Sequence, residues 1–276
     1  MLEIINDTIL DTLKIIPFLF IAFLIIEYTE HKVNHKSTKI VKKAGKLGPI
    51  FGSFLGAIPQ CGFSVMATNL YITRIISLGT LISIYLSTSD EMLLIMVAEK
   101  AAIKDIIIII IIKIIIGIIC GFLIDLFIRT KHDKNYNICK HDHCDCEHNF
   151  IKSATKHTIK TSLFILLTTF ILNSCFHYIG EENIKTIFNH NNFLTPFISS
   201  LIGLIPNCGA SVIITELYLN NVLTLAQSIA GLLTNSGVAL LVLFKSNNSL
   251  KENINIICLL YVIGVISGLI LEIITL

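Results

Sequence analysis

Two short motifs place potential metal ligands at points where a helix is expected to break. Residues 59–62 read Pro-Gln-Cys-Gly and residues 206–209 read Pro-Asn-Cys-Gly, each inside an otherwise apolar stretch. Proline lacks a backbone donor and glycine weakens a helix, so both motifs should interrupt helices. The predicted helix-breaking residues are Pro59, Gly62, Pro206 and Gly209. Amide oxygens and thiolates both bind metal ions, of different softness. The side chains predicted to bind substrate here are Gln60, Cys61, Asn207 and Cys208.

A second pair of interruptions follows each motif along the chain. Residues 87–91, Ser-Thr-Ser-Asp-Glu, form a polar group in the middle of the apolar stretch 76–98, and residues 234–237 read Thr-Asn-Ser-Gly. A carboxylate at membrane depth costs about 2.5–3.5 kcal/mol, so it is usually kept for a transport pathway or a charged partner. The further predicted substrate ligands are Ser89, Asp90, Glu91 and Asn235. The alternative is that this polar group lies near the outer surface and is solvated.

The charged residues in these apolar stretches need partners. Asp90 has a glycine as its counterpart in the second half, so the predicted site is asymmetric and holds one dominant anion. Glu91 points roughly 100° away from its neighbour on a helix. Lys113 lies in the isoleucine-rich run 106–116. It has three open interpretations: a proton-coupling group, an ion-pair partner of Asp90 or Glu91, or a side chain that extends to the membrane surface.

A hydrophilic central loop, residues 132–149, is rich in histidine, cysteine and acidic residues. Dense tracts of histidine and cysteine are typical of binding sites for zinc and related metals. The predicted ligands of this loop are Cys139, His141, His143, Cys144, Cys146 and His148. Their spacing fits no zinc-finger pattern, so we predict a metal-binding loop without a defined zinc fold.

The elements that must position these residues follow from composition and from an internal repeat. The 276 residues are 54% hydrophobic and only 14% charged, which is typical of a membrane protein. The segment GSFLGAIPQCGFSVMATNLY (52–71) aligns without a gap with SSLIGLIPNCGASVIITELY (199–218), an offset of 147 residues (199 minus 52). The chain has no P-loop and no nucleic-acid-binding motif.

Lysine distribution predicts how the two copies are oriented. Residues 31–46 hold six lysines, whereas the equivalent loop 180–192 holds one. Because positive loops stay in the cytosol, the two copies should face opposite ways. We predict an all-α polytopic membrane protein of two inverted-topology repeats, each with three crossings and one re-entrant hairpin, with about ten helical segments in all. The alternative makes 47–73 one long broken span, which would give four crossings per half and parallel copies.

The predicted division of the chain follows from this topology. Residues 1–128 form the first membrane repeat, 129–154 the cytosolic metal-binding loop and 155–276 the second membrane repeat. The protein is predicted to lie in the cell (inner) membrane, with both termini on the outer side of it.

With its two Pro-x-Cys-Gly motifs, the group at 87–91 and the inverted halves, the chain resembles the ten-helix heavy-metal exporter family. That family is also called arsenic-permease-like, and some of its members are considered manganese transporters. The resemblance covers essentially the whole chain. It implies efflux of a heavy-metal or metalloid species.

The favoured function is a secondary exporter of a divalent cation such as manganese, because oxygen donors suit hard cations. The central loop suits zinc or another heavy metal better. One alternative is an efflux permease for arsenite or an organoarsenical, bound by Cys61 and Cys208; another is an intramembrane enzyme. We expect no catalytic residues, no cofactor besides the transported ion and no nucleic-acid partner. The expected partners are the metal ion, the lipid bilayer and protons in counter-transport, with the oligomeric state and the direction of transport left open.

Overall fold

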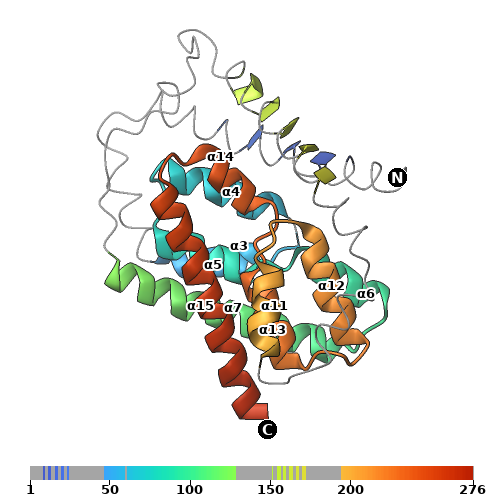
Figure 1. Ribbon diagram of the computed structural model, residues 1–276. Helices are drawn as coiled ribbons and strands as arrows, with labels where there is room; N and C mark the ends of the chain where they lie inside the picture. The colour runs from blue at the N-terminus through green and yellow to red at the C-terminus, as the bar shows by residue number, and fades with distance from the viewer. Residues whose placement is uncertain are drawn as a thin grey trace.

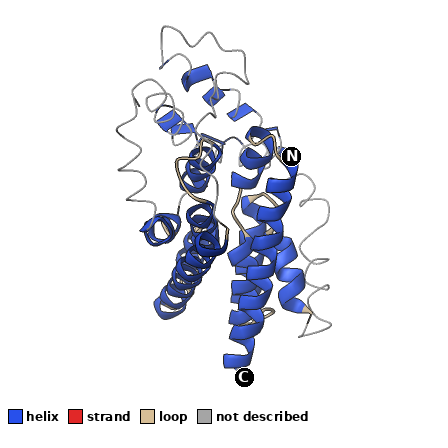
Figure 2. Ribbon diagram, turned by 90° about the vertical axis from the view of Figure 1, so that its left-hand side faces the viewer, coloured by secondary structure: helices blue, strands red, loops and turns tan. Residues whose placement is uncertain are grey.

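The computed structural model describes residues 47–59, 61–128 and 194–275, together with scattered positions within 9–24 and 151–171. The described residues form helices joined by turns and loops, with no strand among them (Figures 1 and 2). The scattered positions are all helical. Most of the two helices predicted at 9–27 and 156–174, and the whole of the central loop 132–149, lie outside the described residues.

Within the continuously described residues, the two halves contain the same series of five helices. In the first half these are α3 (Gly48–Gly56), α4 (Cys61–Ile72), α5 (Leu78–Ser87), α6 (Asp90–Ala98) and α7 (Ile103–Phe127). In the second half they are α11 (Thr195–Gly203), α12 (Cys208–Leu219), α13 (Leu225–Thr234), α14 (Ala239–Ser246) and α15 (Leu250–Thr275). Adding 147 to the bounds of α3, α4 and α5 gives those of α11, α12 and α13. The repeat in the sequence is therefore also a repeat of helices.

Among the described residues, four helical segments are long and apolar enough to cross a membrane. They are Leu78–Ala98, Ile103–Phe127, Leu225–Ser246 and Leu250–Ile274. The first and third, which combine α5 with α6 and α13 with α14, are mostly buried inside the protein, whereas only 28% of each of the other two is buried. The two interrupted spans therefore form the centre of the protein, and α7 and α15 flank it. This agrees with the predicted polytopic membrane protein.

Small residues bring the backbones of α3, α5 and α7 close together. A Cβ added to Gly52 on α3 would lie 2.8 Å from the Ser83 hydroxyl oxygen on α5. On α7, a Cβ on Gly117 would lie 2.8 Å from the Ser53 hydroxyl oxygen, and one on Gly121 would lie 2.7 Å from the Gly79 carbonyl oxygen. Small residues four apart allow this approach, which is a main source of helix association in a bilayer.

The chain reverses direction between α3 and α4. Gly48 lies against Thr80, and Gly56 lies against Ser87, so α3 and α5 run in the same direction. The end of α3 therefore lies beside the end of α5. Because α5 begins six residues after Ile72, α4 must return to the end at which α3 began. Helices α3 and α4 are thus the two arms of a hairpin rather than one long broken helix.

Equivalent carboxylates support the start of each interrupted span. The Ser77 hydroxyl and the Gly79 N–H, at the start of α5, donate to the Asp125 carboxylate at 2.7 and 2.8 Å. In the second half, the Gln227 amide donates to Glu272 at 2.9 Å. Gln227 also forms a capping box with Thr224 at the start of α13. These contacts satisfy helix N-terminal groups that would otherwise lack partners.

The two halves interlock. Helix α4 of the first half packs against α14, and α12 of the second half packs against α6. The interrupted spans also touch each other directly through α5 and α13. Figure 1 shows α4 beside α14 and α12 beside α6. Each hairpin therefore buries its second arm against the broken span of the other half.

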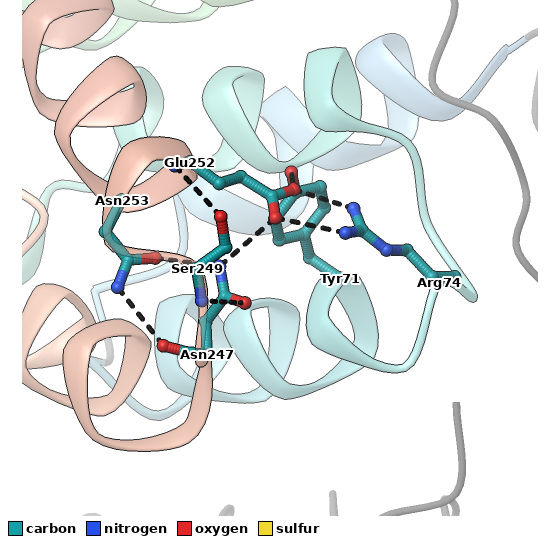
Figure 3. A network of polar contacts seen from close by, with 6 residues as sticks. All are labelled: Tyr71, Arg74, Asn247, Ser249, Glu252 and Asn253. Atoms are coloured by element: carbon teal, nitrogen blue, oxygen red, sulfur yellow. Dashed lines mark hydrogen bonds and ion pairs between the residues drawn. The ribbon is translucent and has the colours of Figure 1, made fainter. Parts of the chain in front are cut away.

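A charged network joins the halves at one end of the protein (Figure 3). Arg74, in the turn between α4 and α5, makes a bidentate contact with the Glu252 carboxylate, with N–O distances of 2.7 and 3.0 Å. The Tyr71 hydroxyl also donates to Glu252, and Asn247 donates to it at 3.4 Å. The contact with Glu252 is the main reason that the pKa of Arg74 is raised. Paired charge-assisted hydrogen bonds of this kind are strong and directional.

Replacing Glu252 with glutamine should lower the stability of the purified protein. The glutamine amide is neutral and has one acceptor oxygen, so it cannot replace the two hydrogen bonds that the carboxylate accepts from the guanidinium. Hydrogen bonds to charged groups contribute about 1.5–3 kcal/mol each. Thermal unfolding in detergent, followed by loss of helical signal, is the measurement. The control is Lys251→Gln, which neutralises an exposed neighbour on the same helix and should leave the midpoint unchanged. Equal midpoints for both variants would show that the network contributes nothing.

Candidate functional site

The candidate site consists of two tips and two breaks, the points at which the helices are interrupted. The first tip is the turn of the α3–α4 hairpin, of which residues 57–59 are described, and the second tip is residues 204–207 between α11 and α12. The first break is Thr88–Ser89, between α5 and α6, and the second break is residues 235–238, between α13 and α14. All four interrupt helices at equivalent places in the two halves.

Each tip lies beside the break of its own half. In the first half, a Cβ on Gly56, just before the first tip, would lie 2.5 Å from the Ile84 carbonyl oxygen, four residues before the first break. In the second half, the Thr234 hydroxyl, at the edge of the second break, donates to the Ser200 carbonyl oxygen of α11 at 2.8 Å. The tip and the break of each half therefore form a single region.

Lys113 connects the two regions. Its ammonium donates to the Thr88 carbonyl oxygen in the first break and, at 2.9 Å, to the Leu232 carbonyl oxygen near the end of α13. Its side chain is only 1% exposed. Of the three sequence interpretations, extension to the membrane surface is wrong, because the side chain points into the protein instead. Pairing with Asp90 or Glu91 involves carboxylates whose side chains the structure does not describe.

The first break is lined with buried hydroxyl groups. Ser87, Thr88 and Ser89 are each at most 5% exposed. The Thr88 hydroxyl donates to the Ile84 carbonyl oxygen at 2.7 Å, and the Ser89 hydroxyl donates to the Ser87 carbonyl oxygen at 3.0 Å. Because these hydroxyls donate their hydrogens to backbone carbonyls, their oxygens can still accept a hydrogen bond from a bound species or coordinate it.

The second break is held by a local turn. The Gly237 N–H donates to the Asn235 side-chain oxygen at 2.8 Å, and Gly237 has a φ of 56°, which favours glycine. The Ser236 hydroxyl, equivalent to that of Ser89, is buried and has no hydrogen-bond partner within the described part of the chain. A buried polar group without a partner is uncommon, so Ser236 is a candidate substrate ligand.

The structure places the predicted ligands at or beside these interruptions. Cys61 and Cys208 are the first residues of α4 and α12, and Asp90 and Glu91 are the first two of α6. Asn207 immediately precedes α12, is 1% exposed and has an extended backbone. The side chains of Cys61, Asp90, Glu91 and Cys208 are not described, and Gln60 lies outside the described residues.

Of the predicted helix-breaking residues, the two prolines lie in the tips and the two glycines lie in the helices that follow them. Pro59 and Pro206 lie within the tips, as expected for residues that stop a helix. Gly62 and Gly209 are instead the second residues of α4 and α12, so helix resumes at the cysteines before them. The six predicted metal ligands of the central loop, from Cys139 to His148, lie outside the described residues.

The described side chains do not by themselves form a metal centre. Within the described ranges, no three histidine, cysteine, aspartate or glutamate side chains are grouped so as to hold a metal ion. That search does not reach the carboxylates and thiols at the starts of α4, α6 and α12. The part of the site that the structure describes supplies hydroxyls, backbone carbonyls, the Asn207 amide and the Lys113 ammonium.

Sequence reasoning missed a pair of polar residues on the second hairpin arms. Asn69 on α4 is 2% exposed, and its side-chain nitrogen has no hydrogen-bond partner among the described residues. The equivalent residue on α12 (69 plus 147) is the half-buried Glu216. The signal was available, because Glu216 is a carboxylate inside the apolar stretch 208–219.

These features define an integral membrane protein whose centre is built from interrupted helices, an architecture shared by many transporters. The chain belongs to the family described as "Putative, 10TM heavy-metal exporter", whose model matches residues 1–174 and again residues 145–275. The resemblance identified in the sequence is therefore confirmed. The chain matches no curated protein and no solved structure.

Replacing Ser236 with alanine should lower transport without lowering stability. The hydroxyl has no partner in the described part of the protein, so its removal should not cost folding free energy. The control is Ser228→Ala on α13, whose buried hydroxyl donates to the Thr224 carbonyl oxygen at 2.8 Å. That variant should lose stability, by about 1 kcal/mol, and keep its flux. Thermal unfolding and metal flux in vesicles measure both; unchanged flux in Ser236→Ala would remove this hydroxyl from the site.

Proposed function

We propose that this protein exports a heavy-metal species by exposing the region around the tips and breaks alternately to the two sides of the membrane. The observation that carries the proposal is the link that Lys113 makes between the first break and the end of α13. Through it, interruptions from both halves meet at one buried point. In transporters built from inverted repeats, such interruptions form the substrate site near the midplane. Transport, rather than catalysis, is the proposed activity.

The contact between Arg74 and Glu252 supports an inverted arrangement of the two repeats. Arg74 lies in the turn before the interrupted span of the first half. Glu252 lies just after the turn that precedes the last helix of the second half. Within one half these two turns lie at opposite ends of an interrupted span. Copies pointing the same way would bring like ends together, whereas this ion pair joins unlike ends. The hairpins would then be re-entrant loops.

The lysine distribution supports an orientation for this arrangement. With residues 31–46 and 129–154 in the cytosol, most lysines and arginines lie on the cytosolic side. Both termini then lie outside the cell (inner) membrane. The cytosolic loop, with its histidines and cysteines, would capture or sense metal before transport. It lies outside the repeated helices, so it is not itself the translocation site.

Labelling of the loop cysteines tests the orientation. A membrane-impermeant maleimide should not modify Cys139, Cys144 or Cys146 in intact cells but should modify them in inverted vesicles. The control is Glu99→Cys, an exposed position at the end of α6 that should face outside and react in intact cells. Labelling of the loop from outside, with Glu99→Cys protected, would reverse the proposed topology.

The favoured substrate is a divalent cation such as manganese, exported in exchange for protons. Asp90 and Glu91 begin α6 at the first break, where their carboxylates could supply negative charge to a hard cation. Oxygen donors from the buried hydroxyls and from Asn207 would complete its coordination. No resident cofactor is required for this exchange.

One observation favours the second candidate, arsenite or an organoarsenical. The Lys113 ammonium lies at the same break, and like charges held close together in a protein interior repel each other. That repulsion opposes a bare cation but not a neutral arsenic species. Cys61 and Cys208, at the starts of α4 and α12, would supply the thiols for such a substrate.

Two variants separate these substrates. Asp90→Asn keeps the shape of the side chain and removes its charge, so it should lower manganese flux by at least about tenfold, the effect of 1.4 kcal/mol. Cys61→Ser should lower arsenite flux and spare manganese. Both fluxes are measured in everted vesicles, with expression checked for each variant. Normal manganese flux in Asp90→Asn, together with loss of arsenite flux in Cys61→Ser, would replace the cation by the metalloid.

A further inference from the structure

The surroundings of Lys113 resemble those of a bound cation. Lys113 is almost completely buried in the middle of α7, a helix otherwise made largely of isoleucine. Its ammonium contacts two backbone carbonyls that come from different halves of the protein. An ionised lysine at membrane depth is costly to bury, so such residues usually mark a transport pathway or an ion site.

Both carbonyls belong to the ends of helices. Thr88 is the residue that terminates α5, and Leu232 lies in the last turn of α13, which ends at Thr234. The last carbonyls of a helix lack partners within that helix and carry the negative end of its dipole. Two such ends that face one point form a position suited to a cation. In ion-coupled transporters with inverted repeats, half-helix C-terminal ends bind the free coupling ion.

The second half provides an internal comparison. The residue equivalent to Lys113 (113 plus 147) is Leu260, which is fully buried in the hydrophobic core. The repeated helix therefore packs at this position without a charge. Because a leucine is enough to fill the equivalent position in the second half, the ammonium of Lys113 has a role that the second half does not share.

We propose that the Lys113 ammonium is a tethered cation that occupies a coupling-ion position formed by the carbonyl ends of α5 and α13. A free monovalent cation is then not needed at this position, and metal export proceeds without sodium. The statement that export proceeds without sodium rests on the proposed transport function. The cation position itself can be tested without any flux.

Removing the tether and supplying the cation separately tests this directly. Lys113→Ala removes three carbons and the ammonium, the atoms of propylammonium. Loss of charged hydrogen bonds should lower flux by about tenfold to a hundredfold. Added propylammonium should restore a large part of that flux and raise the thermal midpoint of the purified variant. Tetramethylammonium, which carries the charge without N–H donors, should do neither.

The matched control is Leu260→Ala, which opens a similar space at the equivalent position. Propylammonium should change neither its flux nor its midpoint, which also controls for effects of amines on a proton gradient. Wild-type flux should be unchanged when choline replaces sodium. The proposal would be overturned if Lys113→Ala transports as fast as the wild type, or if propylammonium rescues both variants equally. It would also be overturned if propylammonium fails to stabilise Lys113→Ala, or if the wild type requires sodium. If propylammonium stabilises Lys113→Ala while the wild type moves no metal, the cation position stands and the proposed substrate is wrong.

Discussion

Backbone polar groups at membrane depth must find partners within the protein, and the centre of this structure depends on that constraint. Four interruptions leave N–H and carbonyl groups without helical partners, in a segment of the chain where water is scarce. Side chains meet the need: the Ser89 hydroxyl donates to the Ser87 carbonyl, the Asn235 side-chain oxygen accepts from the Gly237 N–H, and Lys113 donates to Thr88 and Leu232. Broken helices are stable here because polar side chains accompany them.

Close packing makes those contacts possible. Glycines and serines let α3, α5 and α7 approach until their backbones nearly touch, which brings each tip beside its break. The second arms of the hairpins then pack across to the opposite half. The region around the tips and breaks is thus assembled from both repeats.

The repeat preserves shape while its chemistry diverges. Arg74 and Asn221 occupy equivalent turns and share a left-handed backbone, with φ of 58° and 56°. Only the arginine can form an ion pair with a carboxylate. Lys113 and Leu260 differ in the same way. The duplicated scaffold therefore carries the basic side chains of Arg74 and Lys113 in its first half only.

The sequence by itself determined the membrane class, the duplication, the family and the positions of the interruptions. These depend on local chemistry: apolar length, proline without a donor, and polar groups recurring at the same register. It also contained cues that went unused, such as the capping box at Thr224 and the carboxylate of Glu216.

Only the tertiary structure decided which interruptions meet. Lys113 lies far from Leu232 in the chain, and Arg74 lies far from Glu252. Such contacts depend on how closely small residues let helices approach and on the direction in which each hairpin returns. Those distances arise from the packing of several helices at once, so no single segment of the sequence encodes them.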